Sequence, residues 1–130
     1  MKKVFLIVLA LTAFVACQIK VENKVYGKGE VVSVGVDEFA RAIADSAVQL
    51  VDVRTAEEYS QGTIPGSVNI DVNSGNFGVT ADSLLDKDRT VAIFCRSGRR
   101  SKKAAEILSL NGFNVVELDK GYSSWVEAGK

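Results

Sequence analysis

The sequence predicts an α/β domain in which helices cover both faces of a parallel β-sheet. Short apolar runs typical of strands alternate along the chain with segments of helical period, which is the pattern of parallel sheets. The most apolar run, 90–94, leads directly into Cys95 and a basic loop that precedes a helix. Open parallel sheets bind ligands at the carboxyl ends of such strands, so the pattern also predicts where a site would lie.

The first strand and helix are predicted at 31–34 and 36–47. Apolar residues in the second segment recur on one helical face. The acidic residues Asp37 and Glu38 fall in its first turn, where the helix dipole favours them. A mostly buried strand is expected to follow at 48–53.

The middle of the chain is predicted to hold shorter elements. Residues 55–59 have the composition of a short helix, with Thr55 as a candidate N-cap. A turn at 62–66 precedes a short strand at 67–70.

The segment that follows is predicted to be irregular. Residues 71–81 contain two glycines and are expected to form a loop, with a helical turn at 83–85. Three acidic residues raise the alternative of a calcium loop, but the EF-hand spacing is absent and a solvated acidic loop is preferred: Asp82, Asp86 and Asp88.

The last elements complete the alternation. A helix is predicted at 101–110, and Asn111 and Gly112 are a natural helix stop. The final strand is expected at 113–118 and a short helix at 121–128, whose tryptophan we assign to the core.

The first 16 residues are interpreted as a signal peptide. Lys2 and Lys3 precede an apolar run at 4–15, which as a helix would span about 18 Å, short of the ~30 Å hydrocarbon core of a membrane. The run ends at Phe-Val-Ala-Cys, which resembles a bacterial lipoprotein signal in which Cys17 is lipidated. Plain secretion and a hydrophobic N-terminal helix remain as alternatives.

This interpretation divides the chain into a signal peptide at 1–16, a polar tether at 17–30 and one domain at 31–130. We expect export to the bacterial periplasm or cell envelope, with membrane contact only through a lipid on Cys17. Processing there would leave Cys95 as the one thiol of the domain.

Composition excludes several classes of function. The 130 residues contain 16 Lys and Arg, 16 Asp and Glu and no histidine. A net charge of zero gives no global field for nucleic acid. The lack of histidine excludes a Ser-His-Asp triad, a Cys-His dyad and His-ligated zinc sites, and two cysteines exclude a Cys-rich metal site. We expect no metal and no cofactor.

The loop after the most apolar strand carries the chemistry. Cys95 is followed within eight residues by five cations: Arg96, Arg99, Arg100, Lys102 and Lys103. A thiol at a helix N-terminus beside arginines ionises easily, so a thiolate nucleophile would form without a histidine base. Gly98 lets the loop turn its N–H groups inward toward an anion. We expect the substrate to contact Arg96, Ser97, Gly98, Arg99 and Arg100. The alternative is a buried structural cysteine beside a solvated basic helix start.

Three motifs in order resemble the single-domain rhodaneses. The segment CRSGRR fits the Cys-x4-Arg loop of that family, with Cys95 as sulfur-carrying nucleophile. Upstream, 50–70 (LVDVRTAEEYSQGTIPGSVNI) resembles its Asp-Val-Arg…Gly-His-Ile-Pro-Gly signature, and 121–129 (GYSSWVEAG) resembles its closing Gly-Gly-x-x-x-Trp segment. The resemblance covers roughly 31–129 and implies a five-stranded parallel sheet flanked by helices.

Two departures from the family pattern stand out. Thr63 occupies the place of a common histidine, which puts the fine packing in doubt, and Tyr122 stands where a second glycine is common. Asp52 and Arg54 are assigned to the framework near the site: Asp52 is expected to order the strand end, and Arg54 to pair with one of the glutamates at 57 and 58.

The leading hypothesis is a sulfurtransferase that moves a sulfane sulfur from thiosulfate or a similar small anion through a Cys95 persulfide. The acceptor would be cyanide or a thiol, and a monomer is the default. A sulfur carrier or redox partner without turnover is the second hypothesis. A phosphatase or arsenate reductase is the third, and its seven-residue Cys-x5-Arg loop would be one residue longer than the loop here.

Overall fold

The computed structural model describes residues 27–130, which form a five-stranded, all-parallel sheet in the order β1-β5-β4-β2-β3. In chain order the strands are β1 (Val31–Val34), β2 (Gln49–Asp52), β3 (Val68–Asn69), β4 (Val91–Phe94) and β5 (Val115–Leu118). The helices are α1 (Val36–Ile43), α2 (Ala56–Ser60), α3 (Phe77–Leu84), α4 (Arg99–Leu110) and α5 (Gly121–Glu127). The α/β fold predicted from the sequence is therefore confirmed.

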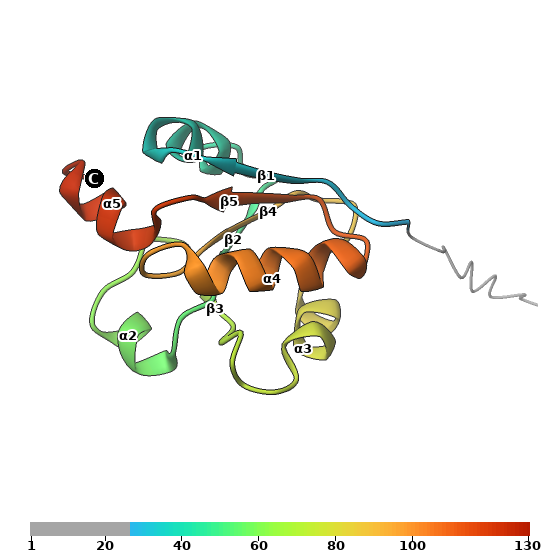
Figure 1. Cartoon of the computed structure of the whole chain (residues 1–130). Helices are drawn as coiled ribbons and strands as arrows, with labels where there is room; N and C mark the ends of the chain where they lie inside the picture. Colours follow the sequence, from blue (N-terminus) through green and yellow to red (C-terminus); the bar gives the residue numbers. More distant parts are fainter. Residues whose placement is uncertain (1–26) are drawn as a thin grey trace, which may run out of the picture.

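Helices cover both faces of the sheet (Figure 1). α1 and α5 pack on one face, where Phe39 and Trp125 join a core cluster with Phe94 and Leu118. α3 and α4 cover the other face in a second cluster. Trp125 stands edge-on to Phe39 with ring centroids 6.1 Å apart, which places it in the core as expected.

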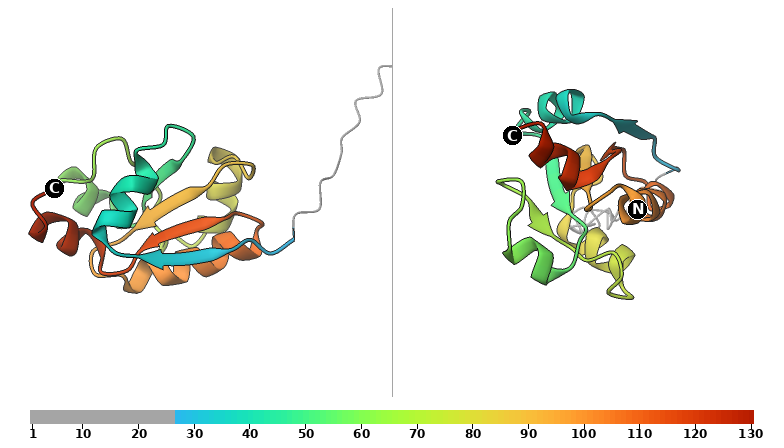
Figure 2. Two further views of the ribbon diagram at one scale, coloured as in Figure 1. Left: turned by 90° about the horizontal axis from the view of Figure 1, so that it is seen from above. Right: turned by 60° about the vertical axis from the view of Figure 1, so that its left-hand side comes forward.

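The carboxyl ends of the strands gather the loops that build the site. The chain leaves β4 into the Cys95 loop at the same end of the molecule as α2 and the start of α5 (Figures 1 and 2). All five strands point the same way, so these segments meet although they are far apart in sequence.

Helix α3 corrects the predicted loop at 71–81. Phe77 and Ala81, one turn apart, are buried against α4. Gly75 does lie in a loop, with φ +89°. Gly78 has another role, because an ideal Cβ there would lie 3.3 Å from the Ile107 side chain. The missing side chain lets α3 approach α4, which a propensity argument does not foresee.

Two helix ends also differ from the prediction for 36–47 and 101–110. α1 ends at Ile43, because the Asp45 carboxylate accepts a hydrogen bond from the backbone N–H of Ala47 (2.9 Å) and turns the chain. α4 begins two residues early, at Arg99, because Gly98 takes a left-handed conformation (φ +98°) as its N-cap.

The proposed tether at 17–30 ends in residues that belong to the packed structure. The backbone N–H of Gly29 donates to the carbonyl of Ser109 (2.9 Å), and the Ser109 hydroxyl donates back to Gly29 (2.6 Å). Glu30 accepts from the backbone of Val115 (2.8 Å). The predicted signal peptide and Cys17 lie outside the described residues. Within residues 27–130, no helix is long and apolar enough to cross a membrane.

Candidate active site

The Cys95 sulfur lies at the base of the loop between β4 and α4. It is buried, with 1% of the residue exposed. The backbone N–H of Gly98 donates to the sulfur (3.1 Å), and the Ser101 hydroxyl lies 3.4 Å from it. An ideal Cβ on Gly98 would overlap the carbonyl of Asp119, so the turn that aims this N–H at the sulfur requires glycine.

Hydrogen bonds make the thiol acidic. Burial raises the pKa of Cys95, but hydrogen bonds from the Ser101 side chain and from the backbone of Ser101, Gly98 and Ser97 outweigh it. The net effect places the pKa of Cys95 below the ordinary thiol value. A low pKa was predicted from a helix N-terminus beside arginines. Ser101 in the first turn of α4 and the backbone of Gly98 and Ser97 lower the pKa of Cys95.

Backbone hydrogen bonds from the start of α5 fix the loop that follows Cys95. The backbone N–H of Tyr122 donates to the Cys95 carbonyl (2.7 Å), and that of Ser123 donates to Arg96 (3.0 Å). Gly121 has φ +69°, and an ideal Cβ there would lie 2.5 Å from the Arg96 carbonyl oxygen. The free N–H groups at a helix start thus satisfy the loop carbonyls, which leaves the loop N–H groups for the sulfur side.

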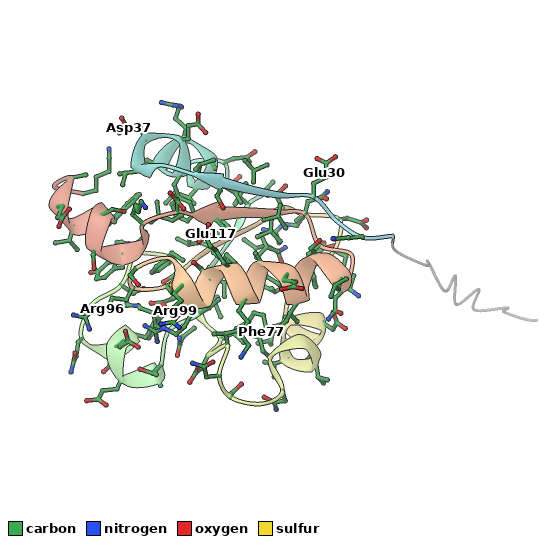
Figure 3. The ribbon with its side chains drawn as sticks, viewed as in Figure 1. Glu30, Asp37, Phe77, Arg96, Arg99 and Glu117 are labelled. Atoms are coloured by element: carbon green, nitrogen blue, oxygen red, sulfur yellow. The ribbon has the colours of Figure 1, made fainter. Side chains whose placement is uncertain are left out.

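The cations of the loop divide into two groups. Arg100 forms two hydrogen bonds to the Glu58 carboxylate (2.6 and 2.9 Å). Lys102 binds Asp119 (2.9 Å) and lies 3.3 Å from each carboxylate oxygen of Glu117. The other three cations are exposed to solvent and form no ion pair with a carboxylate within residues 27–130: Arg96, Arg99 and Lys103. Figure 3 labels the two arginines.

Asp52 and Arg54 form the buried framework beside the loop, but not with the predicted partner. Arg54 pairs with Asp52 (Nη2 to Oδ2, 2.7 Å) and not with a glutamate of α2, because both side chains leave the end of β2 toward the same space. Asp52 also accepts from the backbone of Arg54 (3.0 Å) and from the Thr63 hydroxyl (2.9 Å). Thr63 therefore supplies a polar contact to the framework.

Tyr122 contacts this framework through its ring. The Arg54 guanidinium lies over the Tyr122 ring, 4.4 Å from its centroid. Counted back from Trp125, the glycine pair of Gly-Gly-x-x-x-Trp falls on Lys120 and Gly121. The departure from the family pattern is therefore Lys120, and the conformationally demanding glycine is present.

An open pocket of about 500 Å³ lies next to the loop. Its walls come from α2, α5 and the loop, and include Arg54, Glu58, Arg96, Tyr122 and Val126. Cys95 itself is not in the lining, so the pocket reaches the loop at Arg96. Within residues 27–130, no group of three or more potential ligand side chains is placed to hold a metal ion.

Comparison with known proteins identifies the family. A model of the rhodanese-like domain matches residues 35–128. This chain belongs to the rhodanese-like family. A sulfurtransferase of Allochromatium vinosum is 35% identical over 95 residues, covering 72% of this chain and 86% of that protein. A thiosulfate sulfurtransferase of Shewanella oneidensis is 33% identical over 94 residues, covering 72% and 90%.

Solved structures agree with the rhodanese-like assignment. A rhodanese-related protein of Thermoplasma volcanium superposes with a TM-score of 0.66 at 32% identity, covering 75% of this chain and 93% of the other. The general activity class of the relatives, sulfur transfer, is therefore supported for this rhodanese-like chain.

The sequence did not predict a role for Ser101, which contacts the sulfur, or for Glu117, which contacts Ser101. Ser101 was assigned to an ordinary helix start, and Glu117 to a strand, with no role at the site. A signal for Glu117 was present, because it is the one charged residue in the apolar segment FNVVEL at 113–118. A charge inside a buried strand indicates a specific set of partners.

Replacing Gly121 with alanine tests the close fit between α5 and the loop. Gly66 is the matched control, because its φ is also positive (+88°) but nothing lies within 4 Å of an ideal Cβ. G66A is expected to cost about 1 kcal/mol of backbone strain, and G121A about 1–3 kcal/mol more through the clash with the loop. Urea unfolding of both variants measures the difference; equal losses would contradict the close fit.

Acid unfolding tests the Glu58–Arg100 pair. The Arg100 hydrogen bond, opposed by burial and aided by Thr55, lowers the pKa of Glu58 from 4.5 to about 2. The charged carboxylate therefore stabilises the fold above the unfolded-state pKa, and this stability is lost as pH falls toward 2. Between pH 5 and 2, the free energy of unfolding should fall by on the order of 1 kcal/mol more in the wild type than in E58Q. This variant keeps the capping box with Thr55.

The matched control is E57Q, on the same helix. Glu57 forms no ion pair with the described residues, so this variant should retain the acid sensitivity of the wild type. Chemical denaturation at several pH values gives the comparison. If the free energy of unfolding of E58Q depends on pH as that of the wild type does, the Glu58–Arg100 pair adds nothing to acid sensitivity.

Proposed function

We propose that this protein transfers a sulfane sulfur from thiosulfate, or a similar small anionic donor, through a persulfide on Cys95. The observation that carries the proposal is the surroundings of the thiol. At a strand end, an acidified sulfur accepts a hydrogen bond from the backbone of Gly98 and lies 3.4 Å from the Ser101 hydroxyl. Two arginines of the same loop are exposed and form no ion pair within residues 27–130: Arg96 and Arg99.

In the first step the Cys95 thiolate attacks the outer sulfur of thiosulfate. A new bond forms between the two sulfurs as the sulfur–sulfur bond of thiosulfate breaks, and sulfite leaves with the bonding electron pair. The negative charge moves to the terminal sulfur of the persulfide. The loop N–H groups and the free arginines stabilise the negative charge on the leaving sulfite and on the persulfide.

In the second step the acceptor, cyanide or a thiolate, attacks the terminal sulfur. The persulfide bond breaks and its electron pair returns to the Cys95 sulfur, which regenerates the thiolate. The hydrogen bonds from Gly98 and Ser101 that acidify the resting thiol also favour this leaving group. A covalent intermediate shared by two half-reactions predicts ping-pong kinetics.

The burial of Cys95 supports a slim donor. Only 1% of the residue is exposed, so the attacked atom must be a terminal sulfur that enters between the loop side chains. The outer sulfur of thiosulfate meets this requirement, and its oxygens would remain near Arg96 at the edge of the pocket.

Intact mass of the full chain, without reductant, tests the carrier step. After incubation with thiosulfate, the wild type should gain the mass of one sulfur atom and Cys95→Ser should gain none. Addition of cyanide should remove the extra mass. A stable persulfide that cyanide or thiols do not discharge would indicate a carrier without turnover. No gain at all would contradict thiosulfate as the donor.

The free arginines are tested by the rate of loading. In the double variant R96Q/R99Q, loading at limiting thiosulfate should slow roughly tenfold, because local positive charge raises the capture of an anion. The control is the double variant R41Q/K28Q, which removes the same number of positive charges away from the loop. Equal slowing in both would show an effect of net charge alone.

We also propose that the protein is exported and lipid-anchored through Cys17, on the lipoprotein-like segment that ends there. The full chain made in a bacterial host should be recovered from membranes with a mature mass that begins at Cys17 and includes lipid. The variant C17A should lose that mass increment. An unmodified Cys17 in the mature wild-type chain would refute the anchor.

A further inference from the structure

Glu117 is a fully buried carboxylate that the proposed sulfur transfer leaves without a role. It lies in β5 and points between that strand and α4 (Figure 3). A carboxylate in the interior is costly unless each oxygen finds donors. The donors around it therefore indicate what the residue does.

Two hydroxyls and one ammonium surround the Glu117 carboxylate. The Ser33 hydroxyl, from β1, donates to Oε1 (2.6 Å), and the Ser101 hydroxyl, from α4, donates to Oε2. Lys102 is the charged group that faces it, 3.3 Å from both oxygens, and Asp119 shares that ammonium. Lys102 is half exposed, so its charge is partly screened by water.

Ser101 joins Glu117 to the nucleophile. Its hydroxyl oxygen hydrogen-bonds to Glu117 on one side and lies 3.4 Å from the Cys95 sulfur on the other. The Ser101 side chain is completely buried. A serine hydroxyl carries one proton, so it donates to the carboxylate or to the sulfur, and not to both at once.

This single proton creates two self-consistent arrangements. With a neutral thiol, Cys95 donates to Ser101 and Ser101 donates to the Glu117 carboxylate. With a thiolate, Ser101 donates to the sulfur, and its bond to Glu117 survives if the carboxylic acid donates to the serine oxygen. Going from the first to the second, the thiol loses a proton, Glu117 gains one, and Ser101 exchanges one for another, so protons and charge balance.

We propose that Glu117 is a positioning residue that shares one proton with Cys95 through Ser101. The inference rests on the proposed role of Cys95 as a nucleophile. In the persulfide the Cys95 sulfur is bonded twice and carries no charge, so Ser101 again donates its proton to the Glu117 carboxylate. The proton that Glu117 held passes to water on the side of the half-exposed Lys102. Formation of the persulfide on Cys95 would then favour the ionised form of Glu117, and protonation of Glu117 would disfavour the persulfide, because linkage is reciprocal.

The test follows the carboxyl carbon of Glu117 by NMR in the reduced full chain labelled with ¹³C-glutamate. The signal is assigned by through-bond correlation and by its absence in E117Q. Glu117 should keep its proton to a pH about one unit higher, or more, in the wild type than in C95S, whose hydroxyl mimics the neutral thiol but does not ionise. Superimposable titrations would overturn the proposal.

Further variants separate this linkage from a structural role. The ultraviolet absorbance of the Cys95 thiolate should appear at lower pH in E117Q than in the wild type, by a similar interval, because linkage is reciprocal. In an S33A background, the difference between Cys95 and C95S should persist, since Ser33 touches only the far oxygen. In S101A it should shrink; an undiminished difference would overturn the route through Ser101.

These measurements need no sulfur donor, so their outcome is independent of whether thiosulfate loads the protein. Failure of the mass-gain experiment with a positive NMR result would remove thiosulfate and leave the proton link. The reverse combination would leave sulfur transfer and remove the link. The comparison of wild type with C95S stands even if E117Q does not fold.

Discussion

The site depends on a contact between two backbone segments that meet without side chains between them. The first N–H groups of α5 take up the carbonyls of Cys95 and Arg96, and this fixes the loop with its own N–H groups turned toward the sulfur. Gly98 and Gly121 make the approach possible, because each has a positive φ and lies so close to a neighbouring carbonyl that a Cβ would clash with it. The low pKa of the Cys95 thiol therefore depends on backbone packing at the end of the sheet together with the Ser101 side chain.

Charge in and around the loop is arranged around this frame. Arg54 and Arg100 are each bound to a carboxylate. Arg54 pairs with Asp52 at the end of β2, and Arg100 joins α4 to α2 through Glu58. The unpaired guanidiniums, at 96 and 99, keep their donors for an anion. A protein of zero net charge thus presents unpaired positive charge in the Cys95 loop.

The sequence was sufficient for the features that local chemistry determines. Short patterns predict the Thr55 N-cap, the parallel sheet and the position of Cys95 after a buried strand. Helix α3 did not, because Gly78 reads as a breaker until its neighbour on α4 is known. The partner of Arg54 and the link from Ser101 to Glu117 were also out of reach, since geometry at the strand ends and contacts between β5 and α4 decide them.

The two ends of the described chain leave the domain on opposite sides. Gly29 is pinned to the amino-terminal side of the sheet, whereas α5 and the last residues lie beside the Cys95 loop (Figures 1 and 2). A purification tag or reporter fused after Lys130 would sit a few residues from Val126 in the pocket wall and would crowd it. Immobilisation on a sensor surface is therefore best made through the amino-terminal side, which leaves the pocket beside the Cys95 loop facing the flowing solution.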